Sequence, residues 1–352
     1  MLSLFCLSIK SIEKDSLVAE AVKVYVSKYE ILEDYSTEVI HLENIVVVNF
    51  IVPIDYNFNQ YNGFVVLGHI GNDILPLAYS NHYKLNAKNE CIKLLLNAYQ
   101  KQLEELIRLG VPLKECIDKD MPHNKVEPLL GKMFWSQHGP YNNKLPMDDN
   151  GKHCVTGCVA LAMGQVMNYY DFPHKGIGQD SCTITYNGKT ETHFVDFQKM
   201  SIRWEMIKSR YISFNRTEES DEVANLLYYC TMSIEPSLSL QRSSAELKKA
   251  CDSFVKHFGY HQSAKLCDKK NYSDSKWIEM IRKELDAGRP VISGAMKHVF
   301  VCDGYDNNFW HINWGWEGMM NGYFRHSILL PKNENLVIPQ YAIINLFPSD
   351  IR

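Results

Sequence analysis

The period of the hydrophobic pattern changes once in the last two-thirds of this chain, and that change limits the fold most. Apolar residues recur at helical spacing around Cys158 and over residues 221–234, 243–258 and 275–287. From residue 291 onward, short runs of β-branched and aromatic residues alternate with turn residues, as in strands. Helices followed by antiparallel strands predict an α+β domain and not a doubly wound one. The expected strands are 291–295, 299–302, 309–314, 322–325 and 341–346.

The first third of the chain predicts a smaller α+β unit. Apolar spacing indicates a helix over residues 16–29 and a longer one over 89–109, which Gly110 is suited to end. Three strand-like segments lie between these helices. They are residues 45–52, 63–69 and 74–79.

A polar connector over residues 111–126 follows. It contains two prolines and several charges but no periodicity. Exposed connectors of this kind are where proteases cut. We therefore divide the chain into a first unit, residues 1–125, and a second unit, residues 126–352.

Composition excludes several classes of function. The net charge of -4 and the 22% of charged residues give no basic footprint for nucleic acid. No apolar run is long enough to span a bilayer. Residues 1–9 are apolar, yet they lack the preceding basic residues and the following small-residue cleavage site of a secretory signal. Two interpretations stay open: a cytoplasmic protein, or a sequence that begins inside a signal peptide.

Cys158 is the first candidate for chemistry. Small and apolar residues follow it over 159–167 and predict a buried helix that 169–173 would terminate. A cysteine at a helix start meets unpaired backbone N–H groups that favour the thiolate, which is the nucleophilic form. The alternative is a buried structural cysteine. That alternative suits most of the ten cysteines, which are scattered along the chain.

His298 is the second candidate, at the start of an apolar strand where a side chain can face a cleft. It follows Cys158 by 140 residues. A cysteine early in a domain with a histidine about 130–150 residues downstream is typical of papain-like peptidases. Taken alone, His298 could equally be a structural histidine.

Two further segments could complete such a site. Asn313 offers an amide and Trp314 a flat apolar cover to a catalytic imidazole, on a strand that would pair with the His298 strand. Gln137 could donate a hydrogen bond to a developing oxyanion. Taken separately, an aromatic core strand and a surface glutamine explain these residues as well.

A zinc site would need the pairs Cys154/Cys158 and His298/Cys302 to supply ligands. The second pair lies on an expected strand, where four residues span about 13 Å. One ion cannot bridge that distance. We therefore expect no metal and no cofactor.

Residues 156–160, 298–304 and 313–316, in this order and spacing, resemble the streptopain family of cysteine peptidases. The resemblance covers nearly the whole chain beyond about residue 15 and extends to residues 63–66 and 77–80. It implies a papain-like catalytic domain over 126–352 and an inhibitory prosegment over 1–125.

The same resemblance implies roles for individual residues. Cys158 would be the nucleophile, His298 the base and Gln137 the oxyanion-hole donor, while Asn313 and Trp314 would support the histidine. The expected activity is that of a secreted or cell-surface cysteine endopeptidase that acts on proteins or peptides through a thioester acyl-enzyme. It would be made as a zymogen, with its own prosegment as intramolecular inhibitor.

The chain departs from the family pattern at two places that concern the choice of substrate. The family usually has glycine immediately before the catalytic histidine, where this chain has Lys297. Residues 236–244, which match a Gly/Ser-rich stretch of the cleft, contain no glycine. From Leu238, Leu240 and Lys297 we expect an apolar subsite that tolerates acidic side chains nearby.

Two other functions remain as alternatives. One is a catalytically degenerate homologue that only binds protein, and the other is a transglutaminase-like acyltransferase. The segment 81–89, between a strand and a helix, is our candidate for the loop that blocks the active site. Self-cleavage is expected within about residues 119–127.

Overall fold

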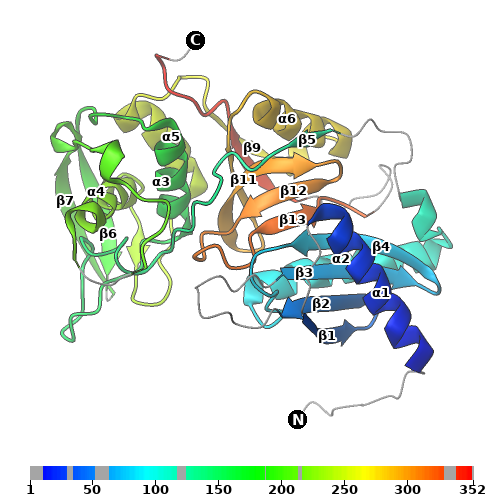
Figure 1. Cartoon of the computed structure of the whole chain (residues 1–352). Helices are drawn as coiled ribbons and strands as arrows, with labels where there is room; N and C mark the ends of the chain where they lie inside the picture. Colours follow the sequence, from blue (N-terminus) through cyan, green and yellow to red (C-terminus); the bar gives the residue numbers. More distant parts are fainter. Residues whose placement is uncertain are drawn as a thin grey trace. The chain divides into compact units, whose positions relative to one another are not determined.

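The computed structural model describes residues 11–29, 35–51, 63–116, 124–186, 188–212, 216–328 and 338–350, with the side chains of 11–15 outside that description. The chain forms two compact units. One consists of residues 1–121 together with 322–334, and the other of residues 122–321 together with 335–352. Each unit contains both helices and antiparallel strands (Figure 1).

The first unit is an antiparallel sheet with a helix on each face. Tyr25 of one helix packs at Gly63, and Leu103 of the other packs at Gly68 on the same strand. These glycines lie an odd number of residues apart, so they face opposite sides of the sheet. The strand order is β1 (Ser36–Leu42), β2 (Ile45–Ile51), β3 (Gly63–Ile70), β4 (Asp73–Ser80) and β13 (Gly322–Arg325), and the helices are α1 (Ser11–Lys28) and α2 (Glu90–Leu109).

Strand β13 joins this unit from far along the chain. It pairs with β4, where the ring of Tyr323 stacks on that of Tyr79 with 5.1 Å between ring centroids. The hydroxyl of Tyr99 donates to the main-chain oxygen of Arg325 at 2.6 Å. The amide of Ile328 donates to the side chain of Gln102 at 2.9 Å. Residues 322–328 are therefore built into the first unit.

Local signals in the sequence explain the helix ends. Asn89 accepts from the amides of Cys91 and Ile92 and so caps α2, while Gly110 takes the left-handed conformation that ends it. The expected helices and the strands at 63–69 and 74–79 are confirmed. The strand expected over 45–52 is β2, and residue 52 lies outside the described residues. Strand β1 was missed because most of its residues are exposed and its pattern is polar.

The second unit has a sheet and a helical part. The antiparallel sheet runs β9–β14–β10–β11–β12, and the short β5 pairs with the far end of β11. Helix α6 packs against β10, β11 and β14. The bounds are β5 (Lys125–Val126), β9 (Lys265–Asp268), β10 (Val291–Ala295), β11 (His298–Asp306), β12 (Phe309–Asn313), β14 (Tyr341–Ile344) and α6 (Asp274–Asp286).

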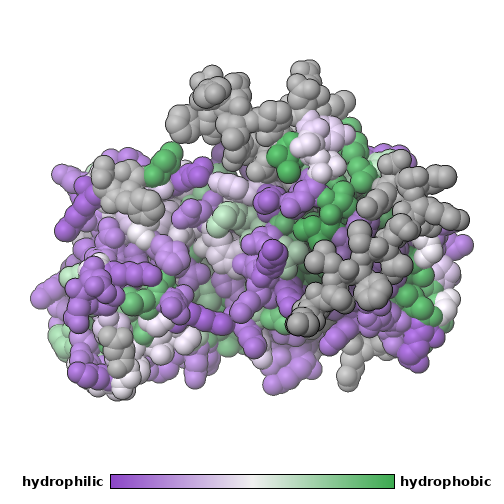
Figure 2. Space-filling view, turned by 90° about the horizontal axis from the view of Figure 1, so that it is seen from below, coloured by the Kyte–Doolittle hydropathy of each residue, from purple (hydrophilic) through white to green (hydrophobic). Residues whose placement is uncertain are grey.

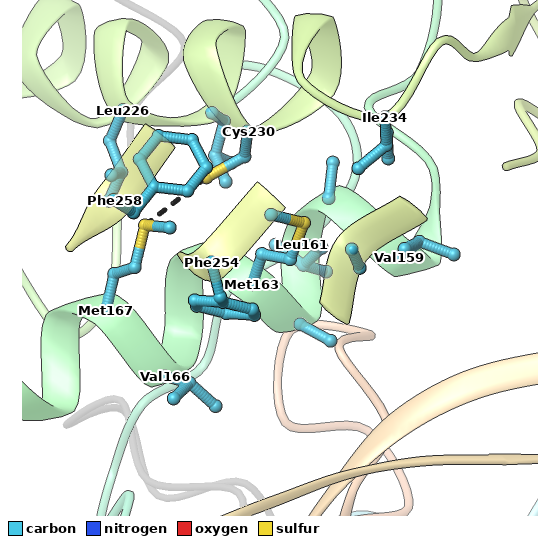
Figure 3. Close-up of a cluster of buried hydrophobic side chains, with 14 of the residues drawn as sticks. Val159, Leu161, Met163, Val166, Met167, Leu226, Cys230, Ile234, Phe254 and Phe258 are labelled. Carbon is cyan, nitrogen blue, oxygen red and sulfur yellow. Dashed lines mark hydrogen bonds between the residues drawn. The ribbon is translucent and has the colours of Figure 1, made fainter. Parts of the chain in front are cut away.

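The helical part has one hydrophobic core, in which α3 (Cys158–Tyr170) packs against α4 (Glu218–Met232) and α5 (Leu247–Phe258). Figure 3 shows Met163 and Met167 of α3 facing Cys230 of α4 and Phe254 of α5, with the Cys230 thiol 3.7 Å from the Met167 sulfur. Burial of this face fixes α3 against its neighbours. The remaining elements of this unit are β6 (Gln179–Tyr186), β7 (Lys189–Asp196), β8 (Ser237–Leu238) and the 3₁₀ turns Phe197–Lys199, Trp204–Met206 and Lys269–Asn271. The first unit has one further 3₁₀ turn, Leu113–Cys116.

The helices and strands predicted between residues 126 and 352 are present in the predicted order, including the end of α3 at Tyr170, but the strand expected at 322–325 is β13 and belongs to the first unit. The hairpin β6–β7 and the strand β9 were missed. The hairpin pairs exposed threonines across its strands, so its pattern resembles a polar loop.

The segment that follows the connector belongs to the second unit. Asn124 and Asn307 exchange hydrogen bonds, β5 pairs with β11, and the amides of Leu129 and Leu130 donate to Asp303 at 2.7 and 3.0 Å. The carboxylate of Asp303 is fully buried, so these bonds form away from water. Residues 117–123 of the predicted connector lie outside the described residues.

Hydrophilic side chains predominate on the face in Figure 2, with smaller apolar patches among them. No helix in the described parts of the chain combines the length and the apolar character needed to cross a bilayer.

Candidate active site

Cys158 is the first residue of α3. The preceding Gly157 has φ +81° and ψ 152°, a conformation unfavourable for residues with a Cβ, and a Cβ there would lie 3.1 Å from the carbonyl oxygen of Ser243. Glycine thus lets the loop at 243 approach the helix start. All nine cysteines in the described residues are free thiols, and among them Cys158 alone is not fully buried.

Burial and backbone dipoles act in opposite directions on the Cys158 thiol. Burial is the larger effect and raises its pKa. The amides of Val299, Cys158 itself and Val159, together with the charge of Arg242, lower it. The helix-start effect expected from the sequence is present, but burial outweighs it, so the thiol is protonated at neutral pH in this state.

His298 begins β11, directly after a two-residue hairpin turn. Met296 and Lys297 form this turn with φ +52° and +61°, between paired residues Ala295 and His298. The imidazole Nε2 donates to the main-chain oxygen of Trp314 at 2.9 Å. Burial lowers the pKa of His298 to about 4, against the raising effect of that carbonyl, and the charge of Arg242 lowers it further.

Two indole rings cover the imidazole. The ring centroid of Trp316 lies 4.7 Å from that of His298, and that of Trp314 lies 6.2 Å away. The two indoles stack on each other at 5.2 Å with an interplanar angle of 7°. The left-handed Gly315 between them, with φ +72°, leaves room for Leu161 of α3. The sequence predicted Trp314 as the cover, whereas the ring of Trp316 is the nearer one.

Asn313 has a different set of partners. Its amide nitrogen donates to the main-chain oxygen of Met133 at 2.9 Å, and its oxygen accepts from Gln165 of α3 and from the amide of Gly315, each at 3.1 Å. The structure thus places this buried side chain between α3 and β12. The imidazole of His298 is oriented by a backbone carbonyl instead.

Gln137 lies near the helix start, since its main-chain oxygen accepts from the amide of Thr156 at 3.1 Å. Its side chain is half-buried. Thr156 precedes Cys158 by two residues, so the backbone bond brings residues 137 and 158 into one neighbourhood.

Cys158 and His298 line the same cavity, which has a volume of 260 Å³. Val299, the residue after His298, also lines this cavity, and its amide lowers the pKa of the Cys158 thiol. The two candidates are therefore side by side. The other lining residues are Val159, Arg242, Ser243, Ser244, Ala245, Leu247, Gly294, Ala295, Met296, Lys297, Val299, Gln340 and Tyr341.

The expected subsite residues need one correction. Leu238 is buried in the core and Leu240 packs against that core, and neither lines the cavity. Arg242 and Lys297 do line it. Among the described residues, no group of three or more His, Cys, Asp or Glu side chains is placed to hold a metal ion.

Comparison with known proteins identifies the family. Residues 135–324 match the model of the peptidase C10 family. Streptopain from Streptococcus pyogenes is 28% identical over 298 residues, which are 78% of this chain and 74% of that protein. The thiol protease/hemagglutinin PrtT of Porphyromonas gingivalis is 27% identical over 301 residues, 78% of this chain but only 34% of its own length.

Solved structures extend the likeness to both units. A fragment of prointerpain A from Prevotella intermedia matches 90% of this chain and 100% of its own, with a TM-score of 0.72 and 25% identity. Active wild-type interpain A, a cysteine protease of the same species, matches 63% of this chain and 95% of its own, with a TM-score of 0.54 and 31% identity.

These findings define the class of protein: it is a cysteine peptidase with a papain-like α+β fold. More narrowly, the chain belongs to the peptidase C10 family, whose model matches more than half of it.

Proposed function

We propose that this chain is the precursor of an endopeptidase that cleaves proteins or peptides with Cys158 as nucleophile and His298 as acid and base. The observation that carries the proposal is the shared cavity, which Cys158, His298 and Val299 all line.

The reaction uses the free nitrogen of the imidazole. Because Nε2 donates to the Trp314 carbonyl, Nδ1 has the lone pair that takes the proton of the thiol. The thiolate attacks the substrate carbonyl and the C–N bond breaks, while imidazolium protonates the leaving amine. Water then attacks the thioester, His298 accepts its proton, and the acid product and free thiol are released.

Gln137 is proposed as the donor to the oxyanion. Its position beside Thr156, near the start of α3, supports this role. Asn313 is proposed as a positioning residue, because its amide joins the helix that carries Cys158 to the strand that leads into Trp314.

Residues 1 to about 125 are proposed as the inhibitory prosegment. A tethered inhibitor acts at high effective concentration, so modest contacts are enough to block a cleft. The candidate blocking loop, residues 81–89, is anchored at Leu85 by hydrogen bonds to a buried side chain, which supports its role. Asn49, fully buried, accepts from the amide of Leu85 at 2.8 Å and donates to its carbonyl at 3.2 Å.

A secreted or cell-surface location is proposed from the family resemblance. The N-terminal stretch that bears on it, residues 1–9, lies outside the described residues.

The test uses the full-length Cys158→Ala chain, which cannot process itself, with a trace of wild-type protein. We expect the Cys158→Ala chain to be converted to a stable fragment beginning near residue 125. N-terminal sequencing of that fragment identifies the cleavage site. Wild-type chain should hydrolyse an internally quenched peptide only after the same conversion. A wild-type chain that remains at full length while cleaving at full rate would refute the zymogen. Transfer of the acyl group to an added amine in preference to water would indicate an acyltransferase.

A further inference from the structure

The cavity beside Cys158 has an apolar wall and a cationic rim. Val159, Ala245, Leu247 and Ala295 supply the wall, and Gly294 leaves space between Leu247 and Tyr341. A Cβ at Gly294 would meet carbon atoms of those two residues at 3.6 and 3.5 Å. The wall therefore suits the methylene groups of a bound side chain.

Arg242 and Lys297 supply the rim. A guanidinium nitrogen of Arg242 donates to the main-chain oxygen of Lys297 at 3.1 Å, which holds the two residues together. Both side chains are exposed, and the lining includes no aspartate or glutamate. No carboxylate within the described residues forms an ion pair with either cation. Two positive charges at the mouth of one cavity are therefore not neutralised there.

The backbone conformation at Lys297 is a second feature of the cationic rim. Lys297 and its neighbour Met296 both have positive φ, a conformation that is unfavourable for residues other than glycine, asparagine and aspartate. Glycine would occupy this turn without that cost. The chain instead keeps a long cationic side chain next to His298.

On the basis of the proposed peptidase function, we infer that Arg242 and Lys297 make this enzyme select substrates with an acidic side chain, of the length of glutamate, in the cavity beside Cys158. The methylene groups lie along the apolar wall, and the carboxylate binds at the rim. The guanidinium of Arg242 presents further N–H donors, so charge-assisted hydrogen bonds add to the attraction.

The test is a positional scan of internally quenched peptides with blocked ends, using the processed enzyme. At each of four positions on either side of the scissile bond, glutamate is compared with glutamine, which has the same shape and no charge. We expect one position at which glutamate raises kcat/KM by about tenfold over glutamine, the effect of a charge-assisted hydrogen bond. The ratio should fall as salt is raised from 0.05 to 0.5 M, because exposed charges are screened.

Variants assign the effect to the rim. Arg242→Gln with Lys297→Gln should bring the Glu/Gln ratio close to one, and each single change should lower it. Arg242→Glu should reverse the preference, so that lysine exceeds glutamine at the same position. Lys283→Gln, which removes an exposed charge of α6 outside the cavity, should leave the ratio unchanged. Each ratio comes from one enzyme preparation, so incomplete processing of a variant does not affect it.

Two results would overturn the inference: a wild-type ratio below about two at every position, or an unchanged ratio in the double variant. If none of the peptides is hydrolysed, the neutral ones included, the proposed function itself fails. Hydrolysis of neutral peptides without any acidic preference refutes the inference alone.

Discussion

The Nε2 atom of His298 lies 2.9 Å from the main-chain oxygen of Trp314. A carbonyl oxygen can only accept, so Nε2 carries the proton, and the tautomer of the imidazole is set by the backbone. Side-chain substitutions cannot remove that acceptor. The groups that hold the backbone around it become the ones to test.

Asn313→Ala should weaken the fold more than it alters the imidazole. It removes buried hydrogen bonds to Met133, Gln165 and Gly315, and we expect the free energy of unfolding to fall by about 2–3 kcal/mol. The pH profile of kcat/KM should keep its acid limb, because the Trp314 carbonyl remains. An acid limb displaced by a full pH unit would instead assign Asn313 to the imidazole.

Gln137→Ala tests the oxyanion donor. We expect kcat to fall by about 10²–10³, the usual effect of losing one such donor, while far-UV circular dichroism and thermal stability stay close to wild type. Gln262→Ala, which changes an exposed amide of the same unit, is the matched control. Full activity in the Gln137 variant would exclude the role.

His298 should make stability depend on acid. Its folded pKa of about 4 lies below the ordinary value of about 6.5, so the folded state binds the proton less readily than the unfolded chain. Its contribution is therefore present above pH 6.5 and is lost as the pH falls towards 4. The test measures the free energy of unfolding by denaturant at pH 7 and at pH 4 in the Cys158→Ala precursor. Between these pH values it should fall by up to about 3 kcal/mol more than in the same chain that also has His298→Gln. If both chains lost the same free energy of unfolding between pH 7 and pH 4, the burial of a neutral His298 imidazole would be contradicted.

Asn49→Ala should loosen the candidate blocking loop. Loss of both hydrogen bonds to Leu85 is expected to cost about 2 kcal/mol and to raise the residual activity of the unprocessed chain. Lys84→Ala, in the same loop, removes only an exposed ion pair with Glu38 and is the control. A destabilised Asn49 variant with unaltered inhibition would mean that another segment blocks the site.

Cleavage of the connector should leave Asn124 on the mature enzyme. Asn124 pairs with Asn307, and the segment that follows is bound to β11 as far as Leu130, so a cut at or beyond Lys125 would remove part of the sheet. The self-cleavage expected within about residues 119–127 is therefore expected before residue 124. N-terminal sequencing of the processed enzyme gives the answer, and a mature chain starting after Val126 would contradict it.

The sequence predicted the parts of the fold that have strong periodicity or local signals. Helix α2 has its cap at Asn89 and its stop at Gly110, and the His298 strand pairs with the strand of Asn313 as expected. The hairpin β6–β7 was missed because its threonines pair with each other on an exposed face. Such contacts depend on strand register and leave no apolar alternation to detect.

The candidate site was predictable as residue types and not as contacts. Cys158 and His298 could be found by their spacing. That Trp314 acts through its carbonyl, that Trp316 lies nearer to the imidazole, and that Arg242 reaches the cavity depend on the path of the backbone. Leu238 was placed in the cleft by position along the chain, while burial puts it in the core.

Strand β13 has a consequence for how fast the proposed zymogen would become active. Because residues 322–328 complete the sheet of the first unit, cutting the connector does not by itself separate the pieces. In the proposed zymogen, the severed prosegment would stay attached by strand pairing and ring stacking, as a ligand with an affinity and an off-rate of its own. Peptide-bond cleavage and the appearance of activity then become two separate events, and dilution or digestion of the released piece sets the delay between them.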